Sequence, residues 1–130
     1  MRRSKQSLRK AKLRDEGHIL WKEAVAEEYG AKCESCGLSS GPPHHFFPQG
    51  AYAFMRFVVE NGVPLCPSCH HRHHFAGDPT VQQRIIKRRG EAWYRALERK
   101  SKERPAGSYL TVGWYKEQIE RLKSLENVPD

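Results

Sequence analysis

Two pairs of cysteines constrain this chain more than any other feature of its sequence. Cys33-Glu-Ser-Cys36 and Cys66-Pro-Ser-Cys69 each leave two residues between the thiols, so one tight turn can present both sulfurs to a single ion. Two such turns complete a tetrahedral site that leaves no open position, which is typical of structural zinc. The duplicated spacing argues against four unrelated buried cysteines, and neither pair has the thioredoxin-like context of a redox CxxC. We therefore expect a structural Zn²⁺ on all four cysteines.

The length of 130 residues predicts one domain, or one small domain with extensions. The middle third is rich in Pro, Gly and His and poor in long apolar runs, so a metal is expected to add stability there. No apolar run approaches the roughly 20 residues that cross a bilayer, and the N-terminus lacks a signal-peptide pattern. These features predict a cytoplasmic protein without a membrane partner, where paired cysteines indicate metal rather than disulfides.

Apolar residues at helical spacing predict helices in three places: 17–29, 79–103 with an interruption at Gly90, and a C-terminal stretch from Thr111. Gly30 is a suitable stop for the first helix. Asp78 is a suitable N-cap for the second, with Pro79 at its first helical position. Between these helices, residues 53–66 mix strand-forming residues with Asn61-Gly62, which predicts extended structure around a turn.

The net charge of +8 is concentrated in two blocks. Residues 1–14 carry seven Lys/Arg and no acid, and residues 84–104 carry nine Lys/Arg and three Glu. Two basic blocks around a less charged centre favour binding to nucleic-acid phosphates, although a solvated tail and a solubilising helix face are the alternative. We divide the chain into three parts: a basic N-terminal arm (1–16) that is disordered or helical only when docked, a central domain (17–104), and a linker with a C-terminal amphipathic helix packing on that domain (105–130).

Six of the seven histidines fall in two short segments, "PHH" at 43–45 and "HHRHH" at 70–74. Neighbouring side chains of an extended backbone point to opposite sides, so His44 and His45 are expected to face different partners. One of them can bind a metal while the other takes a different role. Taken singly, each histidine would more often be a surface or packing residue than a ligand.

The second histidine segment follows Cys69, where a helix could begin. On such a helix His70 and His74 share a face and could hold one ion, with His73 as the competitor of His74 and His71 facing solvent. The cysteine zinc would then bring the two histidine segments together. A rigid support of this kind is what a catalytic constellation requires.

The run "GPPHHFF…ENGVPLCPSCHHRHH" resembles the motif of HNH (His-Me finger) nucleases, over about residues 33–78. Its more specific part is the pattern N-G-hydrophobic-P-L-C-x-x-C-H. The flank "GDPTVQQRIIKRRGEAWYRALERK" is similar to that of small phage-encoded HNH and recombination endonucleases. The resemblance implies an α+β, mostly helical fold. Its ββα-metal core would be a two-stranded hairpin and a helix around a metal, with helices on either side.

The resemblance also implies a role for each matching residue. These are His45 as the general base, Asn61 as the residue that holds the loop between the strands, and His44, His70 and His74 as ligands of the catalytic metal. Many family members have Asp at the position of His44. An all-imidazole ligand set is softer and lacks carboxylate charge, so Mn²⁺ or Ni²⁺ are candidates beside Mg²⁺.

The implied activity is that of a metal-dependent DNA endonuclease, nicking or structure-specific, which leaves 5′-phosphate and 3′-hydroxyl ends. We expect a monomer or homodimer, in the bacterial host cytoplasm if the chain is phage-encoded. Its phosphate contacts are expected from Arg56, Arg72, Arg84, Lys87, Arg88 and Arg89. The alternatives are a non-catalytic, zinc-stabilised nucleic-acid-binding module and an RNase on the same scaffold.

Overall fold

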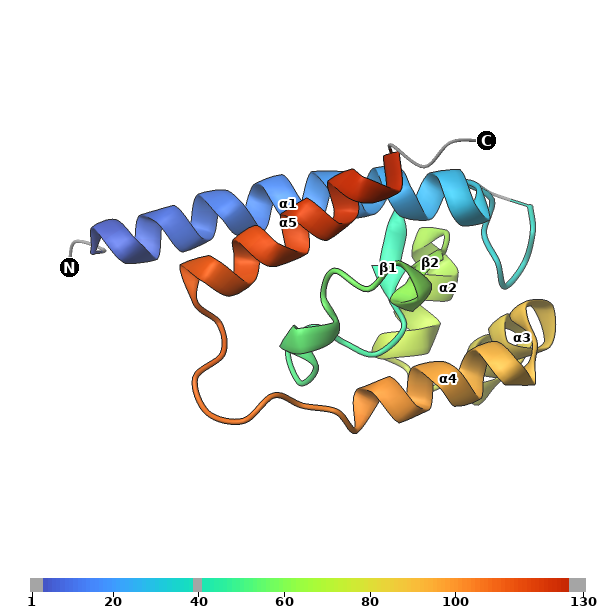
Figure 1. Cartoon of the computed structure of the whole chain (residues 1–130). Coiled ribbons are helices and arrows are strands. Elements are labelled where there is room, and N and C mark those ends of the chain that lie inside the picture. The colour runs from blue at the N-terminus through green and yellow to red at the C-terminus, as the bar shows by residue number, and fades with distance from the viewer. Residues whose placement is uncertain (1–3, 39–40, 127–130) are drawn as a thin grey trace.

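The computed structural model describes residues 4–38 and 41–126, and this part of the chain is mostly helical (Figure 1). The helices are α1 (Lys5–Tyr29), α2 (Pro67–His74), α3 (Pro79–Arg89), α4 (Glu91–Ser101) and α5 (Val112–Glu126). Strands β1 (Pro43–His45) and β2 (Gly62–Pro64) form an antiparallel sheet, and two short 3₁₀ helices, η1 (Ala53–Met55) and η2 (Val59–Asn61), precede β2. The expected mostly helical α+β class is confirmed at this level.

Helix α1 differs from the expectation for the N-terminus. The sequence predicts a separate arm over 1–16 and a helix from Gly17, but one helix runs unbroken from Lys5 to Tyr29. Ser4 caps it, because its side-chain oxygen accepts a hydrogen bond from the Ser7 amide at 3.1 Å. Lys, Arg, Gln and Ala fill the first turns, and these residues favour helix without forming an apolar stripe. Residues 1–3 lie outside the described part.

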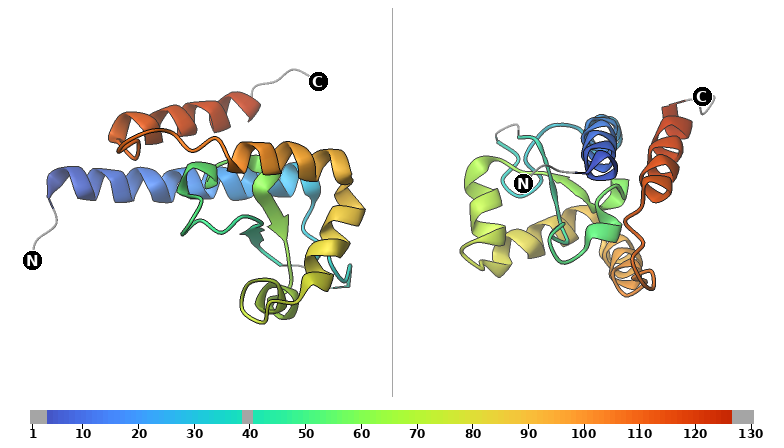
Figure 2. Two further views of the ribbon diagram at one scale, coloured as in Figure 1. Left: turned by 90° about the horizontal axis from the view of Figure 1, so that it is seen from below. Right: turned by 90° about the vertical axis from the view of Figure 1, so that its left-hand side faces the viewer.

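Helix α5 lies along α1 and runs in the same direction (Figures 1 and 2). The interface forms one of two core clusters, made of Trp21, Val25, Phe57, Tyr115 and Leu122. The start of α5 matches its prediction, since Thr111 Oγ1 accepts a hydrogen bond from the Trp114 amide at 3.1 Å.

The second core cluster lies between the sheet and helices α3 and α4. It includes Val63 and Leu65 from the β2 region, Val81 and Ile85 from α3, and Leu97 from α4. The local signals for these helices are confirmed: Asp78 Oδ1 accepts from the Thr80 amide at 2.9 Å, and Gly90, with φ 100°, separates the two helices. Strand β2 therefore lies between α1 and the α3–α4 pair.

The predicted turn at Asn61-Gly62 is wrong. Asn61 ends η2, and Gly62 begins β2 in an extended conformation, with φ −91° and ψ 127°. Glycine is needed there for close packing: a Cβ on Gly62 would lie 2.9 Å from Trp21 Cζ2 and still closer to Val25 of α1. The dipeptide thus marks the contact between α1 and the sheet, while the partner of β2 is the distant β1.

Candidate metal centre and histidine site

The four cysteines converge as the sequence predicts. Their sulfur atoms all lie within 4.8 Å of one another, and Cys36 Sγ is 3.9 Å from Cys66 Sγ. Four thiolates at 2.3 Å from a tetrahedral zinc would lie about 3.8 Å apart, so the arrangement fits this ion. Cys33 and Cys36 come from the turn after α1, whereas Cys66 and Cys69 lie at the start of α2. These residues could hold one metal ion between two segments that are distant in the sequence.

The thiol environments differ in a way that a divalent cation would resolve. Burial alone would raise the pKa of Cys33, but hydrogen bonds from the backbone of Cys36, Cys66 and Ser35 lower it to about 6. Burial raises the pKa of Cys69 to about 12, and hydrogen bonds with Cys66 and Cys33 add to the rise. One thiolate therefore disfavours the next, and a bound cation is what would allow all four to lose their protons.

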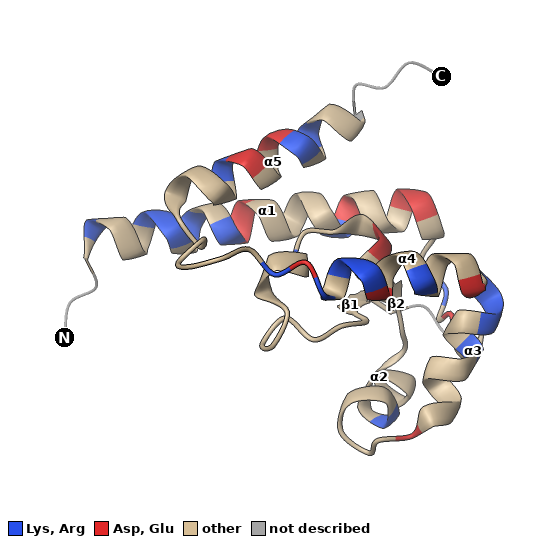
Figure 3. Cartoon of the chain, turned by 60° about the horizontal axis from the view of Figure 1, so that its bottom comes forward, with Lys and Arg blue, Asp and Glu red and all other residues tan. Residues whose placement is uncertain are grey.

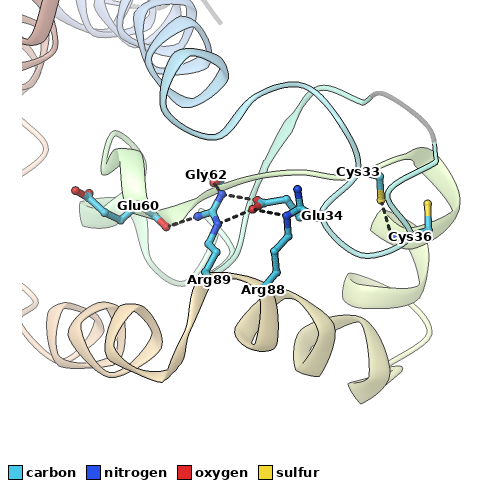
Figure 4. A network of polar contacts seen from close by, with 7 residues as sticks. All are labelled: Cys33, Glu34, Cys36, Glu60, Gly62, Arg88 and Arg89. Atoms are coloured by element: carbon cyan, nitrogen blue, oxygen red, sulfur yellow. Dashed lines mark hydrogen bonds and ion pairs between the residues drawn. The ribbon is translucent and has the colours of Figure 1, made fainter.

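A buried ion pair connects the first cysteine turn to the rest of the domain (Figure 4). Glu34, between Cys33 and Cys36, accepts a hydrogen bond from Arg89 Nε at 2.9 Å and another from Arg89 Nη2. Arg89 also donates to the carbonyl oxygens of Glu60 (3.1 Å) and Gly62 (2.6 Å). The end of α3 thereby holds both the metal turn and the start of β2.

Arg89 was expected among the phosphate contacts, and the structure corrects this. Its side chain is only 3 % exposed, and all three of its guanidinium nitrogens donate hydrogen bonds within the protein. Its guanidinium carbon also lies 3.4 Å from the centroid of the Tyr29 ring. The prediction failed because the sequence of a basic run does not show which of its side chains point to solvent and which point into the protein.

The other basic candidates remain at or near the surface. Arg84 and Lys87 are exposed on α3. Arg88 is 55 % exposed, with its Nε 3.9 Å from Glu34, and Arg72 pairs with Asp78 at 3.2 Å. Arg56 is half-buried, and its Nε has no hydrogen-bond partner in the described part of the chain.

The pairing of β1 with β2 separates the surroundings of His44 and His45. His44 lies opposite Val63, and its ring stacks on His70 with 3.6 Å between centroids. His45 lies opposite Gly62, and its ring stacks on Trp21 of α1 at 4.2 Å. Both contribute to one hollow of about 420 Å³, whose other lining residues are Pro48, Gln49, Gly50, His70, His74 and Phe75.

The histidine ligand candidates do not converge as the cysteines do. Among the described residues, the cysteines form the only group of three or more potential ligands whose donor atoms come together. The rings of His44, His70 and His74 instead stack or meet edge to face. Burial lowers the pKa of His44 to about 4 and also lowers the pKa values of His70 and His74. These imidazoles are thus neutral at pH 7, the form that can bind a metal.

His73 lies apart from this hollow. Its ring packs on Phe46 with 5.4 Å between centroids, and its Nε2 is 3.4 Å from the Phe46 carbonyl oxygen. His74 is the member of this pair that lines the hollow. Of the two competing positions, the geometry favours His74.

His45 and Asn61 have well-defined hydrogen bonds. His45 Nε2 lies 2.9 Å from the Arg56 carbonyl oxygen, and since a carbonyl can only accept, Nε2 donates and Nδ1 is the unprotonated nitrogen. Asn61 is fully buried; its Oδ1 accepts from the Phe47 amide at 2.8 Å, and its Nδ2 donates to the Phe47 carbonyl at 3.1 Å. Asn61 thereby fixes the chain after β1, which leads into the loop that lines the hollow.

Two residues beside His45 were not anticipated as part of the site. They are Trp21 and, one turn earlier, His18, and both lie on α1. The His18 ring lies 6.3 Å from that of His45 and 5.6 Å from that of Trp21. The histidine motifs could not predict them, because both residues come from the distant helix α1. The only signal in the sequence was their i, i+3 spacing, which places them on one face of that helix.

Comparisons with protein-family models, with curated proteins and with solved structures found no match to this chain. In the part of the chain that the structure describes, no helix combines the length and the apolar character that a membrane span requires. Fold and site together define a mostly helical α+β protein in which four clustered cysteines could hold a metal ion and four histidines line one hollow.

Proposed function

We propose that this protein is a metal-dependent HNH-type DNA endonuclease. The observation that carries the proposal is that His44, His45, His70 and His74, from two distant segments, line one hollow. A short antiparallel sheet and the helix that follows it present these side chains. The four-cysteine centre, with one Zn²⁺, would hold the two segments in place.

His44, His70 and His74 would hold the catalytic ion. Three neutral imidazoles suit Mn²⁺ or Ni²⁺ better than Mg²⁺, which prefers oxygen ligands. The rings of His44 and His70 are stacked, so both would have to rotate until one nitrogen of each points to the shared ion. When bound, a divalent cation would supply charge stabilisation at the phosphoryl oxygens and the departing 3′-oxygen.

His45 would act as the general base. Its Nε2–H is held by the Arg56 carbonyl, which leaves Nδ1 to take a proton from the attacking water. Burial lowers its pKa to about 4, and an anionic phosphate beside the ring would raise this value toward neutrality. Attack of that water on phosphorus would leave 5′-phosphate and 3′-hydroxyl ends.

A non-catalytic, zinc-stabilised nucleic-acid-binding module is the second candidate. The observation that favours it is the ring stacking of the histidines, whose donor atoms do not converge as the cysteine sulfurs do. This reading uses the metal centre and the basic residues but assigns no chemistry to the hollow.

A plasmid-nicking assay separates the two candidates. Zinc-loaded protein is incubated with supercoiled DNA, without further metal or with Mg²⁺, Mn²⁺ or Ni²⁺. We expect metal-dependent conversion to open circles, reduced about 10²–10⁴-fold in His45→Ala, since this is the usual contribution of a general base. His71→Ala is the matched control, because His71 is exposed on α2 and does not line the hollow.

Cleavage by His45→Ala at the wild-type rate would contradict the assignment of the base. A salt-sensitive gel shift without cleavage in any metal would support the binding module instead. Cleavage of a labelled RNA, with DNA left intact, would favour the RNase.

A further inference from the structure

A second group of basic side chains lies on the α1 side of His45, away from the candidate metal ligands. Arg14 and His18 come from α1, and Arg56 follows η1. The His18 ring lies 6.3 Å from the His45 ring, and the charge of Arg56 acts on both. Burial lowers the pKa of Arg56, and the positive charge of Arg14 adds to this effect. Burial and the charges of Lys22 and Arg56 lower the pKa of His18, and Asp15 opposes this shift, so the two arginines carry the positive charge of the group.

The two arginines have no acidic partner among the described residues, whereas Asp15 acts on His18. Arg14 and Arg56 make no ion pair there, and Arg56 Nε is buried without a hydrogen-bond partner. The basic residues on the other side of the molecule differ, since Arg72 and Arg89 are each paired with a carboxylate. Half-buried cations without a counter-charge are costly, so this arrangement calls for an anion from outside the chain.

A hollow continues this charged surface along α1. It has a volume of about 380 Å³ and is lined by Ser7, Lys10, Ala11, Arg14, Leu110 and Tyr115. Lys10, Arg14 and His18 are spaced four residues apart and so follow one face of the helix. They span about 12 Å at 1.5 Å per residue, which matches the axial rise of about three to four phosphates of one DNA strand.

The charge along α1 is also strongly divided (Figure 3). Residues 5–14 contain five Lys/Arg and no acid, whereas residues 15–29 contain five Asp/Glu and one Lys. A polyanion is attracted to the first half and repelled by the second, so the helix charge favours phosphate binding along residues 5–14.

We propose that Lys10, Arg14, His18 and Arg56 form a phosphate track that binds the backbone of one DNA strand and leads it to His45. The end point of the track rests on the proposed function, but the binding does not. Because its members contact phosphates and not bases, the track is indifferent to DNA sequence.

The test is DNA binding by the full, zinc-loaded chain without added divalent cation, so that cleavage does not interfere. Fluorescence anisotropy with a labelled DNA duplex gives Kd over a range of salt concentrations. Arg14→Gln should weaken binding about tenfold and lower the slope of log Kd against log salt by about 0.9, the value for one lost phosphate contact. Arg14→Lys should retain the slope.

The matched control is Lys12→Gln, which removes the same charge from the same helix at an exposed position outside the hollow. Lys10→Gln repeats the test at a second lining residue, and circular dichroism checks the fold of each variant. Equal affinities and salt slopes for Arg14→Gln, Lys10→Gln and Lys12→Gln would overturn the track.

The outcomes also separate the track from the nuclease. If Arg14→Gln loses affinity while the wild type cuts no DNA in any metal, the track stands and the nuclease fails. If nicking depends on His45 and Arg14→Gln binds and cuts like Lys12→Gln, the nuclease stands and the track fails.

Discussion

The surroundings of His45 combine three constraints on one imidazole ring. The Trp21 ring covers one face, the Arg56 carbonyl holds Nε2, and the side chain is largely buried. Burial is the largest cause of a pKa of about 4; the hydrogen bond to the Arg56 carbonyl opposes it, and the charges of His18 and Arg56 add to it. The ring is therefore held neutral and in one tautomer at physiological pH.

This pKa makes stability depend on pH in a definite direction. In the unfolded chain His45 binds a proton with a pKa near 6.5, whereas in the folded protein it binds that proton only near pH 4. Its contribution is thus complete above pH 6.5 and is lost as the pH falls toward 4, by at most about 1.4 kcal/mol per pH unit. His45→Gln removes this titration, so its free-energy difference from wild type should narrow between pH 7 and pH 5.

Urea unfolding of both zinc-loaded proteins at pH 7, 6 and 5 measures that difference. Acid effects on the four cysteines are common to both proteins and cancel. A difference that stays constant with pH would show that His45 titrates normally in the folded protein.

At the scale of elements, local signals predicted some parts well and others not at all. Asp78-Pro79 marked the start of α3, Gly90 marked the break between α3 and α4, and the cysteine spacing predicted that the four thiols come together. These signals act over a few residues, so the sequence displays them. The turn at Asn61-Gly62 was wrong because that glycine serves packing against α1, which lies far away in the chain.

The ion pair of Arg89 with Glu34 could not be predicted for the same reason. The two residues are far apart in the chain, and no local sequence pattern indicates that they pair. Its loss should be severe: Arg89→Met would leave the buried Glu34 carboxylate with only the 3.9 Å contact to Arg88, at a cost of about 3–5 kcal/mol of unfolding free energy. Arg88→Met is the matched control on the neighbouring, largely exposed residue, and should cost less than about 1 kcal/mol.

Urea unfolding measures the free energy of unfolding of both variants. The double variant Arg89→Met/Glu34→Gln tests whether the uncompensated charge of Glu34 causes the loss. It should recover part of the loss, because the uncompensated charge is gone. Equal losses for Arg88→Met and Arg89→Met, or no recovery in the double variant, would contradict this role.

At the scale of the whole molecule, α1 joins the two core clusters. One side of its second half packs with α5 through Trp21 and Val25, and the same residues contact Gly62 of the sheet that carries the histidines. Trp21 also donates a hydrogen bond to the Val58 carbonyl at 2.8 Å. A disturbance of the α1–α5 layer should therefore reach the metal centre, and we expect the described part of the chain to unfold as one unit.

Leu122 in α5 tests this coupling from a position far from the cysteines. It is 2 % exposed, so Leu122→Ala should lower the free energy of unfolding by about 2–5 kcal/mol through lost burial and a cavity. Leu125→Ala, one turn later and 50 % exposed, should have little effect. Thermal unfolding is followed by circular dichroism and, in parallel, by release of zinc to a coloured chelator. If the protein is a single cooperative unit, loss of helix and release of zinc have the same midpoint temperature, and Leu122→Ala lowers both midpoints equally. If Leu122→Ala lowers the midpoint for helix loss but leaves that for zinc release at the wild-type value, the two parts unfold independently.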